Sequence, residues 1–375
     1  MKKNIAIIYG GYSSEKEVSE KSAAGIYSFI DKDKYNVFKV KIECDAWLVD
    51  CGNAMINVDK NDFSFSFDGQ KTKFDFAYNT IHGTPGEDGT LQGYFDMLQI
   101  PYSNCGVLAS ALTFNKFACK LYLKNFGIEV PDSVVIRKNN LYCIKEITSK
   151  LKFPVFVKPN VGGSSIATTK VEAEKNTSIL TLLSHFAKQR TFVKPNVSKS
   201  SVTATKGKKI QQEVHLEKAI KEAFNEAPEV IIEQFISGTE VTCGCLEYNE
   251  RLKPLPITEI VSKNEFFDYN AKYKGEVEEI TPARISTEMT KTIRETTKKI
   301  YHLIDAKGII RVDYIISNNK LILLEVNTTP GMTSTSLIPQ QIAKAKLDMK
   351  RVLSHIIELE YNKVHQKQQK YEPKF

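Results

Sequence analysis

An alternation of apolar runs with helical stretches over the N-terminal third is the feature that most constrains the fold. Residues 4–9 form an apolar run that ends at Gly10 and Gly11, and apolar residues at helical spacing follow over 15–30. Two more strands are predicted over 35–42 and 74–81. This order predicts an α/β fold that begins with a doubly wound parallel sheet.

Further elements alternate along the rest of the chain, whose 375 residues suffice for two to three domains. A long helix is predicted over 109–125. The other predictions are a hairpin over 62–73, helices over 288–303 and near 338–356, and strands over 130–136, 154–158, 230–235, 240–246, 253–260, 308–316 and 320–326.

The composition is that of a soluble globular protein, with 42% hydrophobic and 26% charged residues. No apolar run approaches the roughly 20 residues that span a bilayer, and the opening run is too short for a signal peptide. We therefore expect a cytoplasmic protein that binds no membrane. Seven cysteines, with Cys243 and Cys245 as the closest pair, predict buried unreactive thiols rather than a zinc site.

The net charge of +8 is unevenly distributed along the chain. Residues 188–209 contribute +7 and residues 361–375 contribute +3, so the remainder carries −2. A basic segment can bind nucleic acid, but the chain has no known recognition module, and a solvated basic face is the simpler interpretation. We expect no nucleic-acid partner.

A short internal repeat lies in the middle of the chain. The sequence from Phe156 to Asn160 recurs from Phe192 to Asn196, 36 residues later. Two copies are too few for a solenoid. We interpret them as a local tandem duplication that adds a supersecondary unit or a long loop within one domain.

Three loops carry residues suited to ligand binding. Gly10 and Gly11 precede Glu15 at a predicted helix start, which favours an anion or a tight turn. His82 opens a loop with three glycines after a strand, the usual place for a ligand in a parallel sheet, although a capped turn would also explain it. The loop after Lys158 combines glycine and serine, which suits phosphate or a plain hairpin.

Polar residues on two neighbouring apolar strands near the C-terminus predict a cation site. Asp313, Glu325 and Asn327 would otherwise be buried carboxylates and an amide without partners. Their oxygen atoms suit Mg²⁺. The alternative is a structural salt bridge from Arg311 to a carboxylate. Residues 265–273, aromatic and mixed in charge, predict either a lid that folds over a ligand or an Ω-loop.

In order along the chain, these motifs closely resemble those of D-alanine–D-alanine ligases, a family of ATP-grasp enzymes. The most specific are GGYSSEKEVS (10–19), HGTPGEDGTLQG (82–93) and LLEVNTTPGMTSTSLIP (323–339). The resemblance implies an N-terminal substrate domain (1–104), a central ATP-grasp lid domain (105–236, with the duplication at about 157–208), a C-terminal catalytic domain (237–360) and a basic tail (361–375).

The resemblance further implies an ATP-dependent ligase that joins two D-alanines through an acylphosphate, for peptidoglycan precursor synthesis, and that forms a homodimer. ATP and two Mg²⁺ ions, which Mn²⁺ can replace, would be the cofactors. The implied metal ligands are Asp313, Glu325 and Asn327. The implied ATP-binding residues are Lys116, Lys158, Ser165 and Lys272 on the phosphates, Glu233, Phe235 and Ile236 at the adenine hinge, and Glu240 on the ribose.

The remaining roles implied by the resemblance concern the amino acids. Glu15 would hold the first ammonium group and connect through Ser164 to Tyr273 on the lid. Arg311 and Gly331 would stabilise the tetrahedral oxyanion. The second substrate would be bound by His82, Ser336 and Leu337. By the same resemblance, tyrosine at 273 favours D-alanine over D-lactate as the second substrate. The alternatives are a ligase that uses D-lactate or D-serine and a nucleotide-binding protein with impaired catalysis.

The duplication leaves two candidates for the phosphate loop. Glu233 lies 75 positions after Lys158 but 39 after Lys194, and the shorter spacing is the family's. Only the first copy has the two glycines that let a backbone approach phosphate, so we favour Lys158. Ala167 stands where the family has glycine.

Overall fold

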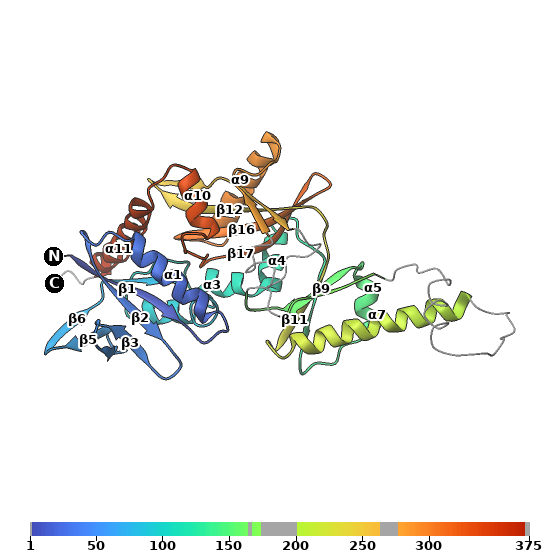
Figure 1. Ribbon diagram of the computed structural model, residues 1–375, viewed down its shortest axis with the longest axis horizontal. Helices are drawn as coiled ribbons and strands as arrows, with labels where there is room; N and C mark the ends of the chain where they lie inside the picture. Colours follow the sequence, from blue (N-terminus) through green and yellow to red (C-terminus); the bar gives the residue numbers. More distant parts are fainter. Residues whose placement is uncertain (1, 164–166, 174–200, 263–276, 372–375) are drawn as a thin grey trace. The chain divides into compact units, whose positions relative to one another are not determined.

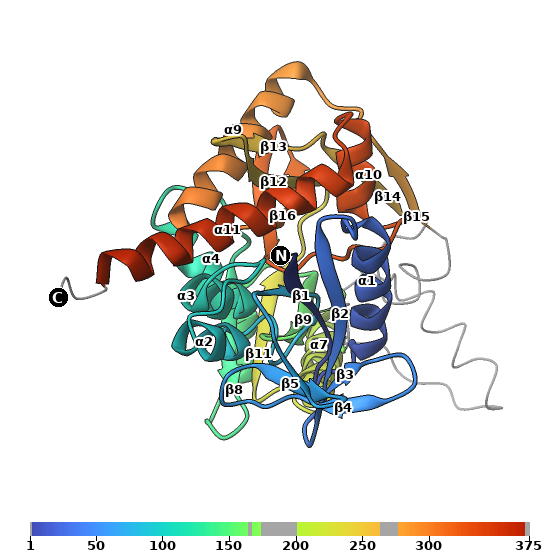
Figure 2. The ribbon, with the colours of Figure 1, turned by 90° about the vertical axis from the view of Figure 1, so that its left-hand side faces the viewer.

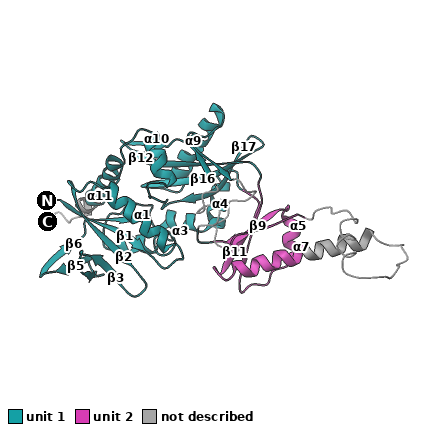
Figure 3. Cartoon of the chain, viewed as in Figure 1, with its two compact units in different colours: residues 1–130, 161–164, 237–375 teal, residues 131–160, 165–236 magenta. Residues whose placement is uncertain are grey.

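The structure is a computed structural model that describes residues 2–163, 167–173, 201–262 and 277–371. The chain forms two compact units (Figure 3). Unit 1 comprises Met1–Val130, Val161–Ser164 and Ser237–Phe375, and unit 2 comprises Pro131–Asn160 and Ser165–Ile236. Within the described ranges, no helix has the length and apolar character needed to cross a membrane.

Unit 1 begins with a five-stranded sheet in the order β4-β3-β2-β1-β7; Figure 1 labels its strands β1, β2 and β3. β1 (Lys3–Gly10) pairs in parallel with β2 (Tyr35–Ile42) and with β7 (Phe76–Asn79). The edge strands β3 (Trp47–Asp50) and β4 (Met55–Asn57) are antiparallel. The predicted parallel sheet is confirmed at its centre.

Both faces of this sheet are covered, which explains why β1 is apolar from Ile5 to Tyr9. Ile7 packs in the apolar cluster that contains α1 (Lys16–Phe29), whereas the next residue, Ile8, packs in the cluster that contains α2 (Thr90–Met97). Side chains alternate across a strand, so successive residues serve opposite faces. Figure 2 shows α1 alongside β2.

The C-terminal part of unit 1 contains a six-stranded antiparallel sheet, in which β15-β14-β12-β16-β17 are neighbours and β13 pairs with β12. Its strands are β12 (Thr239–Tyr248), β13 (Arg251–Pro254), β14 (Thr258–Ser262), β15 (Val277–Ile280), β16 (Ile309–Ser317) and β17 (Lys320–Asn327). The helices are α9 (Thr287–Leu303), α10 (Leu337–Lys344) and α11 (Met349–Tyr371).

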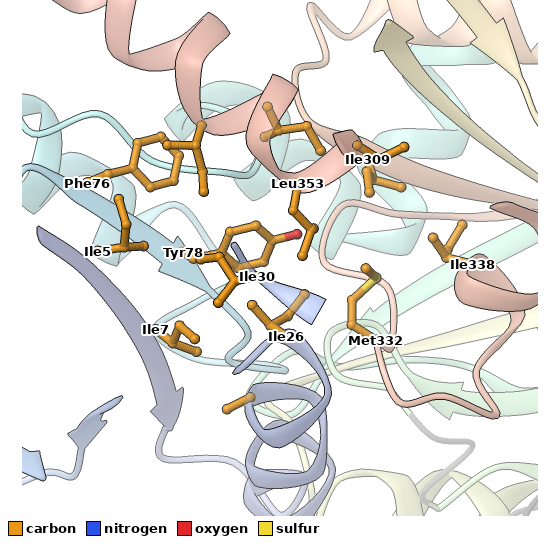
Figure 4. Packing of buried hydrophobic residues seen from close by; sticks show 14 of the residues in the cluster. Ile5, Ile7, Ile26, Ile30, Phe76, Tyr78, Ile309, Met332, Ile338 and Leu353 are labelled. Atoms are coloured by element: carbon orange, nitrogen blue, oxygen red, sulfur yellow. The ribbon is translucent and has the colours of Figure 1, made fainter. Parts of the chain in front are cut away.

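One apolar cluster joins these two parts of unit 1. Figure 4 shows Ile26 of α1 near Met332, which follows β17, and both belong to a cluster that includes Ile309 of β16 and Leu353 of α11. All four are less than a tenth exposed. The loop after β17 is therefore held against α1 by shared burial of apolar surface.

Unit 2 is a four-stranded antiparallel sheet in the order β10-β9-β11-β8. Its strands are β8 (Ser133–Arg137), β9 (Val155–Pro159), β10 (Thr169–Val171) and β11 (Glu229–Gln234), and its helices are α5 (Ile144–Lys150) and α7 (Ser201–Ala223). The first repeat copy forms β9. The second copy, including Lys194, lies outside the described residues.

Several predicted elements are divided in the structure. The helix predicted over 109–125 is two helices, α3 (Val107–Phe114) and α4 (Lys116–Lys124), because Asn115 is extended and its side chain accepts a hydrogen bond from the amide of Ala118. The helix near 338–356 is likewise α10 and α11, and the strand over 253–260 is β13 and β14. The hairpin over 62–73 is confirmed as β5 (Ser64–Phe67) and β6 (Gln70–Lys73).

The prediction that all seven cysteines are buried is wrong for Cys44 and Cys143, which are exposed, and for Cys51, which is partly exposed.

Glu358 on α11 should contribute to stability because it ties the helix to the first two strands. Its carboxylate contacts Lys3 at 2.8 Å and Lys34 at 3.1 Å and accepts a hydrogen bond from the Tyr35 hydroxyl at 2.9 Å. Burial disfavours the charge, but these partners outweigh it and hold the pKa of Glu358 below its usual value.

We predict that Glu358→Gln lowers the free energy of unfolding by about 1 kcal/mol at neutral pH. A depressed carboxyl pKa stabilises the fold only while the group is ionised, so the difference should vanish as acid protonates Glu358 in the folded protein. Urea unfolding at several pH values measures it. Glu295→Gln, which removes an exposed pair with Lys298 on α9, is the matched control and should change stability little.

Candidate active site

A cavity of about 670 Å³ lies in unit 1. Its walls come from the loop after β1, α1, the loop after β7, the start of α4, the glycine loop at 162–163, and the loop that leads from β17 into α10. The predicted site residues that line it are Glu15, His82, Lys116, Arg311, Glu325, Asn327, Gly331, Ser336 and Leu337.

Parallel pairing brings the first two loops to the cavity. β1 and β7 run parallel, so the segments after both strands leave from the same edge of the sheet. The amide of Tyr12 donates to the carbonyl of Thr84 at 2.9 Å, and the hydroxyl of Ser13 donates to the carbonyl of His82 at 2.7 Å. These bonds hold the loop that leads to the buried Glu15 against the loop that begins at His82.

The glycine loop of the first repeat copy approaches Glu15 closely. A Cβ atom added at Gly163 would lie 2.9 Å from both carboxylate oxygens of Glu15, so a side chain there would require the Glu15 carboxylate to move. The ammonium group of Lys116 donates a hydrogen bond to the carbonyl of Gly162. Ala167, a few residues on, has a φ of 50°, a left-handed conformation that accounts for a glycine at this position in a resembling sequence.

The two polar strands meet as predicted. β16 and β17 pair so that Asp313 lies opposite Glu325, and Arg311 lies opposite Asn327. Arg311 holds Asp313 through two hydrogen bonds, of 2.9 and 2.7 Å, and the Asn327 amide donates to Asp313 at 3.0 Å. Burial opposes the charge of Arg311, yet Asp313 outweighs burial and holds the pKa of Arg311 above its usual value.

The structure therefore contains the salt bridge between Arg311 and Asp313 that was the alternative to a metal site. Asp313 is also one of the three predicted metal ligands. Glu325 and Asn327 line the cavity, whereas Asp313 lies behind them and also accepts a hydrogen bond from Thr242. Two carboxylates and an amide oxygen are the hard donors that Mg²⁺ prefers, so the set fits the ion, with Asp313 shared between the metal and Arg311. Among the described residues, no group of three or more His, Cys, Asp or Glu side chains is arranged to hold a metal by itself.

The start of α10 forms another wall of the cavity. Ser336 precedes the helix and Leu337 is its first residue, so the unpaired amides of the first turn can receive an anion. The Ser336 hydroxyl accepts a hydrogen bond from the amide of Thr333 at 3.1 Å. A Cβ atom at Gly331 would lie 3.1 Å from that hydroxyl. Gly331, Ser336 and Leu337 are therefore brought together, as predicted.

Unit 2 carries the other predicted nucleotide residues. Lys158 on β9 and Glu233 on β11 form an ion pair at 2.6 Å. Phe235 packs edge-on against Phe156, with ring centroids 5.5 Å apart, and the ammonium group of Lys170 lies 4.5 Å from the centre of the Phe235 ring. Ile236 follows at the end of this unit, and Glu240 lies on β12 of unit 1. Ser164, Ser165, Lys272 and Tyr273 lie outside the described residues.

Glu87 is a cavity residue to which the sequence analysis gave no role. It lies within the loop that begins at His82, and its carboxylate accepts a hydrogen bond from the amide of Gly83 at 2.7 Å. Burial raises the pKa of Glu87 to about 8. The sequence feature that could have indicated a role for Glu87 is its place among glycines in a loop directly after a buried strand.

Comparison with known proteins identifies relatives over nearly the whole chain. The family profile "D-ala D-ala ligase N-terminus" matches residues 4–105, and "D-ala D-ala ligase C-terminus" matches residues 122–190 and 184–358. The last two stretches overlap inside the duplicated region, as a tandem duplication would produce.

Named relatives cover the same extent. The chain is 50% identical over 360 residues to a D-alanine–D-alanine ligase of Parabacteroides distasonis, covering 96% of this chain and 97% of the relative. It is 48% identical to the ligase of Porphyromonas gingivalis, with 95% and 98% covered. Among solved structures, the VanG D-Ala:D-Ser ligase of Enterococcus faecalis has a TM-score of 0.76 at 30% identity, with 96% and 100% covered. The Bacillus anthracis D-alanine–D-alanine ligase complexed with ATP has a TM-score of 0.68 at 25% identity, with 97% and 99% covered.

The contact of α1 with the loop after β17 should tolerate no side chain at Gly25. A Cβ atom there would lie 2.2 Å from the carbonyl oxygen of Met332. We predict that Gly25→Ala lowers the free energy of unfolding by about 1–3 kcal/mol through overpacking. Gly93→Ala is the matched helical control, since its nearest outside atom is 3.9 Å away, and it should stabilise by up to about 1 kcal/mol. Equal effects of both in thermal unfolding would contradict this packing.

Proposed function

We propose that this chain, which belongs to the D-alanine–D-alanine ligase family, uses ATP to join two D-alanines into D-alanyl-D-alanine for peptidoglycan precursor synthesis. The reaction would activate the carboxylate of the first D-alanine as an acylphosphate, which the amine of the second attacks. ADP and phosphate leave. The observation that carries the proposal is a single cavity lined by the motifs of the amino-acid site together with Glu325 and Asn327.

The amino-acid site has the charges this reaction needs. Glu15 would bind the first ammonium group, connected through Ser164 to Tyr273. Arg311, held by its two hydrogen bonds to Asp313, and the Gly331 amide would stabilise the oxyanion of the tetrahedral intermediate. Ser336, the Leu337 amide and His82 would bind the second D-alanine, consistent with their place at the start of α10 and beside Glu15.

The nucleotide would be bound chiefly by cations and a hinge strand. The residues proposed for the phosphates are Lys116, Lys158, Ser165 and Lys272, and those for the adenosine are Glu233, Phe235, Ile236 and Glu240. The pairing of β9 with β11, which brings Lys158 to Glu233, supports use of the first repeat copy. Asp313, Glu325 and Asn327 would hold two Mg²⁺ ions, or Mn²⁺, and the metal would supply positive charge that offsets the phosphates.

Other expected properties follow from the family and the composition. We infer three domains with the bounds given above, a lid over residues 265–273 that excludes water from the acylphosphate, and a cytoplasmic homodimer without nucleic-acid or membrane partners. The alternatives are a ligase that uses D-lactate or D-serine as its second substrate and a protein that binds nucleotide without turnover. An activity assay distinguishes them from a D-alanine–D-alanine ligase.

The ligase activity predicts phosphate release that requires ATP, Mg²⁺ and D-alanine together. L-Alanine should not replace D-alanine, because Glu15 and Arg311 would fix the first amino acid and the start of α10 would fix the second, so the opposite configuration would point the methyl group of either substrate in a different direction. A coupled phosphate assay with mass detection of the dipeptide measures this. ATP binding by calorimetry without any dipeptide would contradict catalysis, and a preference for D-serine would reassign the second substrate.

The two repeat copies predict different effects of removing their lysines. Lys158→Ala should lower turnover by about 100-fold or more, because a preorganised cation near the transferred phosphate is lost. Lys194→Ala, the matched change in the second copy, should leave turnover near the original value. The opposite pattern would assign the phosphate loop to the second copy.

A further inference from the structure

Glu87 is a carboxylate inside the cavity without an ionic partner. Its one hydrogen bond joins its Oε2 atom to the amide of Gly83, and among the described residues no lysine or arginine lies within ion-pair distance of it. A buried carboxylate normally has a cation or several donors. Glu87 is partly exposed and, among the described residues, has a single neutral donor, so little in its surroundings offsets a negative charge on it.

The position of Glu87 is fixed by an unusual arrangement at the preceding residue. Three side-chain amides donate to the carbonyl oxygen of Gly86, from Asn79 at 2.8 Å, Gln92 at 2.6 Å and Asn104 at 3.3 Å. All three amide side chains are buried. Such a network fixes the backbone at Gly86 and therefore the point from which Glu87 projects.

Gly83 connects Glu87 to the first-substrate side of the cavity. Its amide bonds to Glu87, and a Cβ atom on it would lie 4.0 Å from Oε2 of Glu15. The carboxyl groups of Glu15 and Glu87 therefore both lie close to Gly83 in the wall of the cavity. The other ionisable groups that line the same cavity are Glu15, Lys21, His82, Lys116, Glu279, Arg311 and Glu325.

Condensation of two amino acids requires a proton acceptor. The second amino acid arrives as an ammonium ion, whose nitrogen has no lone pair with which to attack. Resting on the proposed function, we propose that the Glu87 carboxylate accepts a proton from the ammonium group of the second amino acid and so generates the attacking amine.

The step balances with the groups present. The N–H bond breaks and its proton passes to a carboxylate oxygen of Glu87. The amine lone pair then forms the C–N bond at the acylphosphate carbonyl. The C–O bond to phosphate breaks, phosphate leaves with that electron pair, and the remaining excess proton on nitrogen leaves with phosphate. Glu87 returns its proton to solvent when the products depart.

The basicity of Glu87 suits this role. Burial, the largest influence, and the neighbouring carboxylates Glu15 and Glu325 raise its pKa to about 8, although the Gly83 amide and Lys116 oppose the rise. A carboxylate of ordinary pKa would be too weak a base for an ammonium group.

Other groups in the cavity are less suited. Glu15 lies against Gly163 on the first-substrate side, and the Nε2 atom of His82 contacts the Ser22 hydroxyl at 3.4 Å. Glu325 belongs to the proposed metal set. Glu87 forms no hydrogen bond or ion pair with a member of that set within the described residues, so a bound cation would not directly occupy its carboxylate.

The test compares two nucleophiles on the Glu87→Gln variant, which keeps an oxygen acceptor for the Gly83 amide. Hydroxylamine is largely uncharged at neutral pH and needs no base to attack the acylphosphate. We expect dipeptide formation to fall by about 10²- to 10³-fold, while D-alanine hydroxamate formed from ATP, D-alanine and hydroxylamine stays within about threefold of the original rate.

The pH profile supplies a second readout that a purely structural role would not change. In the original protein, dipeptide formation should rise with pH through about 8 as Glu87 ionises. In Glu87→Gln this rise should shift to more alkaline pH, where the free amine of the substrate becomes abundant. Asp88→Asn, which alters the neighbouring carboxylate that accepts from the Thr90 amide, is the matched control and should behave like the original protein.

Each result is decisive. Dipeptide formation by Glu87→Gln at the original rate would overturn the assignment, and so would an equal loss of dipeptide and hydroxamate with an unchanged melting temperature. If the original protein forms neither dipeptide nor hydroxamate from ATP and D-alanine, the proposed function itself fails. Selective loss of the dipeptide supports Glu87 as the proton acceptor.

Discussion

The cavity depends on one apolar contact, between α1 near the start of the chain and the loop that follows β17. Burial of Ile26, Met332 and Leu353 in one cluster brings the loops after β1 and β7 to the loop before α10. The carbonyl of Met332 lies so close to α1 that Gly25 has no room for a side chain. Groups distant in sequence become one site because apolar surface is removed from water at this contact.

The carboxyl groups of Asp313 and Glu87 have different kinds of hydrogen-bond and ionic partners. Asp313 is tied to Arg311 and Asn327, so the arginine that would face an oxyanion is oriented before any substrate binds. Glu87 instead has, among the described residues, a single amide donor, and its carboxyl group ionises with difficulty. One carboxylate therefore orients a cation, while the other retains the capacity to take up a proton.

The sequence predicted the parallel sheet, the polar strand pair and the cavity residues Glu15, His82, Arg311, Glu325 and Asn327 from local apolar patterns and from loops at strand ends. The sequence indicated the cavity residues Lys116, Gly331, Ser336 and Leu337 only through its family resemblance. It failed where a single side chain decided the local structure. Asn115 ends one helix and caps the next, although the surrounding apolar spacing continues through it. The position of Glu87 was not predictable from the sequence because it depends on Asn79, Gln92 and Asn104, whose side chains converge on the carbonyl of Gly86 only in the fold.

The duplicated segment illustrates how geometry distinguishes copies that sequence leaves similar. Both copies contain Phe-Val-Lys-Pro-Asn, yet the first forms β9 and continues into a loop in which Gly163 lies against the Glu15 carboxylate. The second copy has Ser198 and Lys199 where the first has its two glycines, and a Cβ at the Gly163 position would lie 2.9 Å from the Glu15 carboxylate. A copy without glycine therefore cannot replace the first loop unless Glu15 moves, which would displace the group that is to hold the first substrate.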